Sequence, residues 1–191
     1  MTTQALDAAL WAWGRGTGIA ALALFTLSLL LGILGRSGRS WRLFGRVGVS
    51  DLHRTAALTG TGLVAAHVGT LLLDPYAQLK LVDLLFPFLA AYRPLWLGLG
   101  TLAMDLLALV TAVSVLRGRL GPRVFRSVHW ATYAMWPVAL VHALGSGTDA
   151  GTTWFRGFAV VCVVVVASAG LWRLAPSYAG RGWARVPRRT T

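Results

Sequence analysis

The four histidines of this chain stand as two widely spaced pairs inside apolar sequence. His53 and His67 lie fourteen positions apart, and His129 and His142 lie thirteen apart. An ionisable side chain in a membrane-length apolar segment costs free energy, and such residues usually carry a function. Neutral imidazole is also the commonest metal ligand in proteins. The four histidines therefore predict metal binding.

The segments that must position these histidines are long and apolar. Of the 191 residues, 56% are hydrophobic and only 13% are charged, about half the charged share of a soluble domain. We predict an all-α integral membrane protein, a five-helix transmembrane bundle formed by one domain over residues 1–176, followed by a basic and disordered cytoplasmic tail, 177–191. The apolar runs long enough to span a bilayer lie roughly at 17–34, 51–73, 95–116, 127–144 and 153–174.

The formal net charge of +12 is distributed unevenly along the chain. Arginines fill the first loop, the third loop and the tail, whereas the alternate loops hold few basic residues. This is the positive-inside pattern, which predicts a multi-pass protein of the cell membrane with its N-terminus outside and its C-terminus in the cytoplasm. The basic loops would contact membrane lipid, and nucleic-acid binding is excluded as the reason for the charge.

The spacing within each pair decides how the histidines can combine. Fourteen helical residues rise about 21 Å and thirteen rise about 20 Å, so two histidines of one helix cannot share a metal. By the predicted orientation, His53 and His129 lie near cytoplasmic ends, and His67 and His142 lie near outer ends. We therefore expect an inner centre, His53 with His129, and an outer centre, His67 with His142.

Two imidazoles from facing helices suit a haem iron, because the porphyrin supplies the other four ligands. A zinc site would need four protein ligands, or three and a water, and no carboxylate or cysteine is placed to complete one. The chain has no C-x-x-C-H, which excludes covalent c-type attachment. We predict two haem b groups per chain. An iron with two histidine ligands has no open position, which favours electron transfer.

A glycine lies midway between the first two histidines. Gly60 is seven residues from His53 and seven from His67, and seven helical steps return almost to the same face. His53, Gly60 and His67 would therefore form one stripe along the helix, which could leave room for a flat macrocycle next to Gly60. Helix–helix packing through small residues is an equal alternative.

The second pair fits an ideal helix less well. Thirteen steps rotate about 220°, so His129 and His142 would not share a face. Pro137 lies between them, and we expect it to kink the helix and shift its phase.

Three further polar residues accompany the histidines. Arg54 and Arg126 flank the inner centre, where their guanidinium groups could pair with haem propionates. The competing interpretation is that both arginines reach lipid head groups. Asp105 lies in the middle of a predicted span and could orient a ligand histidine, carry a proton, or make a structural hydrogen bond.

These residues together resemble the ferric reductase-like transmembrane domain, over about residues 40 to 175. That family includes ferric reductases, NADPH oxidases and the haem subunit of the bacterial methionine sulfoxide reductase system. The resemblance implies electron flow across the membrane through haems b, with His53, His67, His129 and His142 as axial ligands. It is carried by Leu52-His53-Arg54, Ala66-His67, Tyr92-Arg93-Pro94 leading into Gly98–Asp105, Val128-His129-Trp130 and Val141-His142.

The chain departs from larger members of that family in one respect. It has no G-x-G-x-x-G motif and no room for a flavin and nicotinamide domain after its last span. We therefore expect an oxidoreductase subunit that depends on a separate flavin reductase or a quinol as its electron donor. An outer redox partner or ferric iron would be the acceptor. Two alternatives remain open: a quinol-linked cytochrome b561-type protein, and a non-redox membrane transport or structural subunit.

Overall fold

The computed structural model describes residues 2–37, 46–77, 79–175 and 178. In this part of the chain all regular structure is α-helical. The predicted basic tail, apart from Tyr178, and the arginines within 38–45 lie outside the described residues. The helices are α1 (Thr3–Arg36), α2 (Arg46–Leu73), α3 (Leu81–Leu85), α4 (Pro94–Val115), α5 (Arg117–His129), α6 (Thr132–Ser146) and α7 (Thr153–Leu174).

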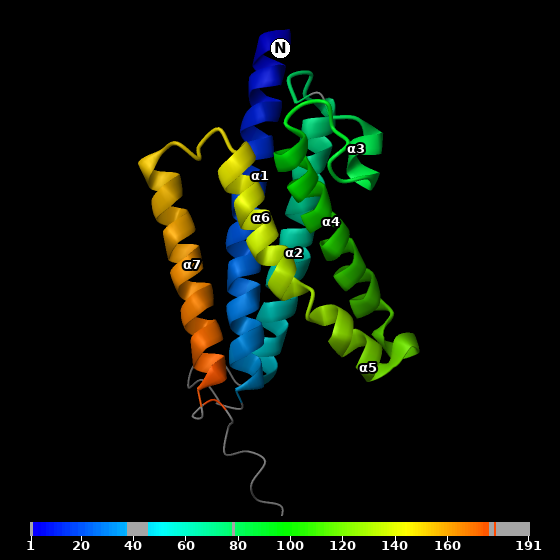
Figure 1. The fold of residues 1–191 in the computed structure, drawn as a ribbon, viewed down its shortest axis with the longest axis vertical. Helices are drawn as coiled ribbons and strands as arrows, with labels where there is room; N and C mark the ends of the chain where they lie inside the picture. The colour runs from blue at the N-terminus through cyan, green and yellow to red at the C-terminus, as the bar shows by residue number, and fades with distance from the viewer. Residues whose placement is uncertain (1, 38–45, 78, 176–177, 179–191) are drawn as a thin grey trace, which may run out of the picture.

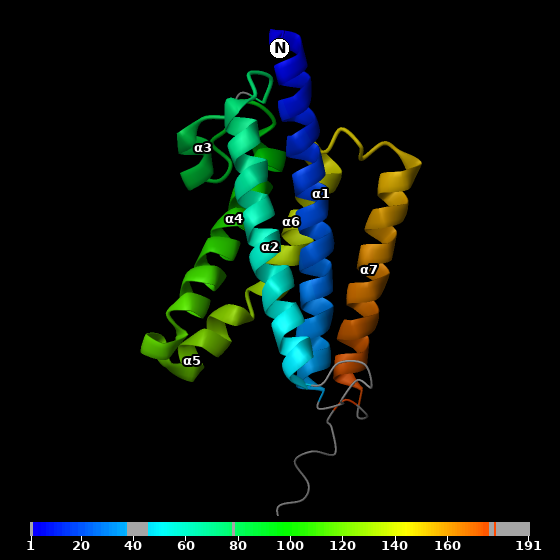
Figure 2. The ribbon, with the colours of Figure 1, turned by 180° about the vertical axis from the view of Figure 1, so that it is seen from behind.

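The bundle is assembled from two helix pairs (Figure 1). Helices α1 and α2 pack side by side along most of their lengths, and the N-terminal turns of α1 extend beyond α2, as the view from behind in Figure 2 shows. Helices α4 and α6 form the second pair, and α7 packs on the far side of α1. The short helix α3 marks one end of the bundle and the oblique helix α5 marks the other. These are called the α3 end and the α5 end below.

Four helices of the described chain are long and apolar enough to cross a membrane: α1, α2, α4 and α7. The protein is therefore a helical membrane protein. The last predicted span, 153–174, coincides with α7. Helix α1 has 34 residues and is about 51 Å long, so it extends well beyond the predicted span 17–34 and beyond a hydrocarbon core of about 30 Å.

The predicted span 127–144 is not one helix. Helix α5 ends at His129, and α6 begins at Thr132 and has 15 residues, about 22 Å and too short to cross a bilayer alone. We expected Pro137 to kink the helix, and α6 continues through that proline without a break. The interruption between the two histidines lies instead at Trp130–Ala131.

The sequence of α5 explains why it leaves the bundle axis. Gly121 adopts φ +78°, a left-handed conformation that glycine tolerates, and Pro122 starts a new helical turn after it. No residue of α5 is buried. From Pro122 onward, Arg123 and Arg126 share one face and Val124, Phe125 and Val128 share the other, as expected for a helix that lies along a membrane surface.

The buried core lies where α1, α6 and α7 meet. Its largest side chain on α6, Trp136, donates its indole Nε1–H to Thr26 Oγ1 of α1 at 2.9 Å. Thr26 in turn donates to the carbonyl of Leu22 at 2.8 Å. The buried members of the core are Leu22, Leu29, Ile33, Trp136, Leu140, Ala159, Cys162 and Ala169.

At the α3 end, one ion pair fastens α1 to the loop between α6 and α7. The Arg15 guanidinium donates to both carboxylate oxygens of Asp149, at 2.7 and 2.6 Å. The Arg15 group also lies 4.0 Å above the ring of Trp11. Such a bidentate contact fixes the positions of both side chains, and so of α1 relative to the loop.

Candidate metal centres

The structure brings the four histidines together as two facing pairs. At the α5 end, the rings of His53 and His129 have their centroids 6.1 Å apart, with the planes inclined at 73°. At the α3 end, His67 and His142 have centroids 6.5 Å apart and planes inclined at 80°. These are the combinations that the spacing and the orientation predict.

The two ring separations agree with one metal held between each pair. A metal–imidazole nitrogen bond is about 2.0–2.1 Å, and the ring centre lies about 1 Å beyond the nitrogen. Two rings on opposite sides of one metal therefore have centres about 6 Å apart. Among the described residues there is no cluster of three or more His, Cys, Asp or Glu side chains that could complete a protein-only site. The residues fit a group that brings its own equatorial ligands, as a haem does.

The helices that carry the facing histidines pack little on one another. In the described part of the chain, α2 packs almost entirely on α1 and makes at most a marginal contact with α6. Each histidine pair therefore joins helices with few direct contacts: α2 with α5 through His53 and His129, and α2 with α6 through His67 and His142.

Three of the four rings are oriented by backbone carbonyl groups. Since a carbonyl can only accept, Nδ1 must carry the proton, which leaves the Nε2 lone pair free for a metal. The Nδ1 atoms and their acceptors are His53 to Ser28 O at 2.8 Å, His67 to Gly14 O at 2.6 Å, and His142 to Trp96 O at 2.7 Å.

Each of these three rings also lies over a glycine of the helix that supplies the carbonyl. A Cβ added to Gly32 would lie 3.3 Å from His53 Cε1, one on Gly18 would lie 3.0 Å from His67 Cε1, and one on Gly100 would lie 2.6 Å from His142 Cε1. In all three cases the glycine follows the carbonyl residue by four positions. A helical carbonyl points toward residue n+4, so a side chain there would block the ring. We call this arrangement the carbonyl–glycine cradle.

The carbonyl–glycine cradles were not predicted from the sequence, although the residue spacing on α1 contains a sign of them. Gly18 and Gly32 are fourteen residues apart, as are the carbonyl residues Gly14 and Ser28. This spacing equals that of the two histidines on the antiparallel helix α2. The equality is meaningful only once α1 and α2 are known to be partners, so it could not have been read from α1 alone.

His129 lacks a cradle. Its Nδ1 atom is buried and, among the described residues, has no hydrogen-bond partner. The ring instead stacks on Phe125, one turn earlier in α5, with centroids 5.2 Å apart and planes inclined at 25°. The two centres therefore differ: at the α3 end both ligands are held by carbonyls, and at the α5 end only one is.

The glycine between the first two histidines has a packing role. Gly60 is buried, and a Cβ added there would lie 3.1 Å from the ring of Phe25 on α1. The contact with Phe25 agrees with the helix-packing alternative for Gly60, and a contact of Gly60 with a macrocycle stays a prediction.

The other predicted polar residues make no described hydrogen bond or ion pair with the histidines. Arg54 and Arg126 are exposed and form no ion pair in the described part of the chain. Asp105 is half-buried on α4 and accepts no hydrogen bond from a histidine in the described part of the chain: three histidines donate to backbone carbonyls, and Nδ1 of His129 has no partner there. The proposed pairing of the two arginines with haem propionates stays a prediction. The described hydrogen bonds give no support to Asp105 as the residue that orients a ligand histidine, and its proton-carrying role stays a prediction.

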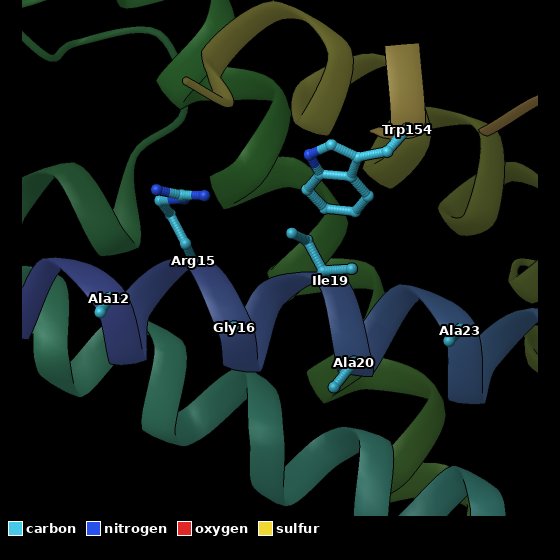
Figure 3. A pocket seen from close by; sticks show the side chains of 7 residues that line it. All are labelled: Ala12, Arg15, Gly16, Ile19, Ala20, Ala23 and Trp154. Carbon is cyan, nitrogen blue, oxygen red and sulfur yellow. The ribbon is translucent and has the colours of Figure 1, made fainter. Parts of the chain in front are cut away.

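A shallow groove lies on the face of α1 that is turned toward α7 (Figure 3). It measures about 450 Å³ and includes Arg15, Gly16 and Ile19, with Trp154 of α7 above Ile19. No histidine lines it. The groove and the histidine pairs are therefore separate features, on different faces of α1.

Comparison with known families agrees with the resemblance seen in the sequence. The sequence model of the family described as "Ferric reductase like transmembrane component" matches residues 17–140, more than half of the chain. This range includes His53, His67 and His129 and ends two residues before His142. No curated protein and no solved structure matches significantly. The chain belongs to the ferric reductase-like transmembrane family.

Proposed function

We propose that this protein is a di-haem b electron-transfer subunit of the cell membrane, which passes electrons from a cytoplasmic reductant to an outer acceptor. The observation that carries the proposal is the pairing of all four histidines at metal-bridging separations, 6.1 and 6.5 Å between ring centres. The family supports a redox role in the membrane. The two centres lie at opposite ends of α2, about 21 Å apart along the helix.

In this proposal the protein contributes orientation and separation. Haem b, when bound, supplies reversible one-electron chemistry. The carbonyls of Ser28, Gly14 and Trp96 fix the tautomer and the ring plane of three ligands and raise their basicity. Two histidines per centre leave no position for a substrate, so each centre is suited to accept and release electrons.

The charge distribution sets the direction in this proposal. The exposed arginines of α5 support a cytoplasmic position for the α5 end, by the positive-inside rule. Electrons would enter at the His53–His129 pair and leave at the His67–His142 pair. The donor would be a separate flavin reductase or a quinol, and the acceptor would be ferric iron or an outer redox protein.

The test is the haem content of the full chain purified in detergent. A pyridine haemochrome assay and a reduced-minus-oxidised spectrum should give about two b-type haems per chain. A protein that folds as helices but binds no haem when haem is supplied would refute the proposal.

Single substitutions then check the pairing. His53→Ala and His67→Ala should each lower the haem content by about half. Ser28→Ala is the matched control, because it removes a hydroxyl 3.1 Å from His53 Nδ1 but keeps the carbonyl that orients the ring. Full haem content in both histidine variants would contradict the assignment.

A further inference from the structure

We infer that His129 is a replaceable ligand, and that a small neutral molecule of the carbon monoxide class can take its place opposite His53. The inference rests on the proposed function, because it needs a haem iron between the two rings. It adds a binding site for small gaseous ligands at the α5 end and none at the α3 end.

The first reason is the missing acceptor. His53, His67 and His142 each donate Nδ1–H to a carbonyl, whereas Nδ1 of His129 is buried without a partner among the described residues. A carbonyl acceptor both holds the ring and increases electron donation to the metal. His129 has neither advantage, so its bond to a metal is the weakest of the four.

The second reason is the helix that carries the ring. His129 is the last residue of α5, which has no buried residue and packs mainly against α4. Figure 1 shows α5 running obliquely away from the rest of the bundle. A segment with few buried contacts opens locally at low free-energy cost. Moving α5 by a small amount would withdraw the His129 ring without disturbing the buried core, and the nearest contact that it would loosen is that of Arg173 with Trp130.

The third reason is the contrast with His142 on α6. Its ring sits in the cradle formed by the Trp96 carbonyl and Gly100. Its own helix contributes Trp136 and Leu140 to the buried core. Withdrawing His142 would break both the hydrogen bond and the packing of α6, so the α3 end should keep both ligands.

The exchange is chemically simple. The bond between the ferrous iron and His129 Nε2 breaks, and a bond between the iron and the carbon of carbon monoxide forms. No electron or proton moves, because the Nδ1 proton stays on the ring. The iron must first be reduced, which dithionite achieves.

The experiment is a carbon monoxide difference spectrum of the dithionite-reduced full chain in detergent. We expect the haem at the α5 end to bind carbon monoxide and the haem at the α3 end not to. The double variant His67→Ala with His142→Ala keeps only the α5-end centre and should still bind. The double variant His53→Ala with His129→Ala keeps only the α3-end centre and should not. Binding in the second variant would overturn the inference.

Phe125 provides a graded test. It is the ring that stacks on His129, so Phe125→Ala should raise the carbon monoxide affinity about threefold to tenfold, the factor that one aromatic contact represents. Val124→Ala is the matched control on the same helix, since Val124 is exposed. Equal changes in the two variants would overturn the role of Phe125.

The outcomes separate the two proposals. Two haems per chain with no carbon monoxide binding in either the wild type or Phe125→Ala would refute the replaceable ligand and leave the proposed function standing. Absence of haem would refute the proposed function itself.

Discussion

Arg173, in the last turn of α7, lies over the ring of Trp130, at the break between α5 and α6. The guanidinium carbon is 4.5 Å from the indole centre, and the same group donates to the hydroxyl of Tyr133. Helix α7 therefore contacts the break between α5 and α6 through Arg173, at a residue directly next to His129. The contact links a peripheral helix to the geometry of the α5-end centre.

Replacing Arg173 should loosen that centre. Arg173→Ala removes a cation–π contact and a hydrogen bond, together about 1–2 kcal/mol. We expect a lower haem content at the His53–His129 pair and an unchanged His67–His142 pair, measured by haemochrome assay and by the two components of the reduced spectrum. Arg156→Ala is the control, because Arg156 is exposed at the other end of α7 and donates only to the carbonyl of Ala150. Equal losses in both variants would contradict this role.

The cradles predict a graded response to added methyl groups. Gly100→Ala places a Cβ 2.6 Å from the His142 ring, whereas Gly32→Ala places one 3.3 Å from the His53 ring. We expect Gly100→Ala to lose most of the haem at the α3 end and Gly32→Ala to lose little at the α5 end. Gly62→Ala, with nothing within 4 Å of its Cβ, is the control for substitution of a helical glycine. A reversed order, measured as haem per chain, would show that the cradles do not position the rings.

The hydrogen bond from Trp136 to Thr26 should stabilise the core. Trp136→Phe removes the donor, and Thr26→Val leaves the indole N–H buried without an acceptor; each should lower the free energy of unfolding by about 1–3 kcal/mol. The double variant should cost less than the sum of the two, because the same bond is lost once. Thermal unfolding in detergent measures all three, and strict additivity would argue against the bond.

The ion pair of Arg15 with Asp149 is open to a charge-swap test. Asp149→Asn leaves a half-buried guanidinium with a neutral partner and should lower the free energy of unfolding by about 1–3 kcal/mol. Exchanging the charges, Arg15→Asp with Asp149→Arg, should recover part of that loss, whereas either reversal alone should cost more than Asp149→Asn. If the double exchange is no better than the single reversals, the pair acts only through its local packing.

The sequence predicted some features well because their signals are local. The apolar run 153–174 has charged or polar residues at both ends, and α7 begins and ends with it. The family resemblance rests on short motifs around the histidines, and it is confirmed by the match over residues 17–140. The opposed histidines follow from counting residues per turn in helices of known direction.

Other features depend on a neighbouring helix and could not be read locally. Pro137 is the obvious helix breaker, but α6 tolerates it and the break falls at Trp130–Ala131, where contacts from Arg173 hold it. Helical periodicity placed Gly60 on the histidine stripe but could not say that Phe25 of α1 would lie against it. The interrupted fourth span shows the same limit, since α5 has the composition of a surface helix rather than of a span.

The carbonyl residues on α1 and the histidines on α2 have the same fourteen-residue spacing, so both helices of this antiparallel pair set the separation of the two centres. Gly14 on α1 accepts a hydrogen bond from His67 on α2, and Ser28 accepts one from His53. The distance between the centres therefore depends on the spacing in each of the two helices. One residue inserted into α1 between Gly18 and Ser28 would turn one carbonyl by about 100° relative to the other. Only one histidine could then stay in register. The separation of the two centres can therefore change during evolution only if both helices change length together.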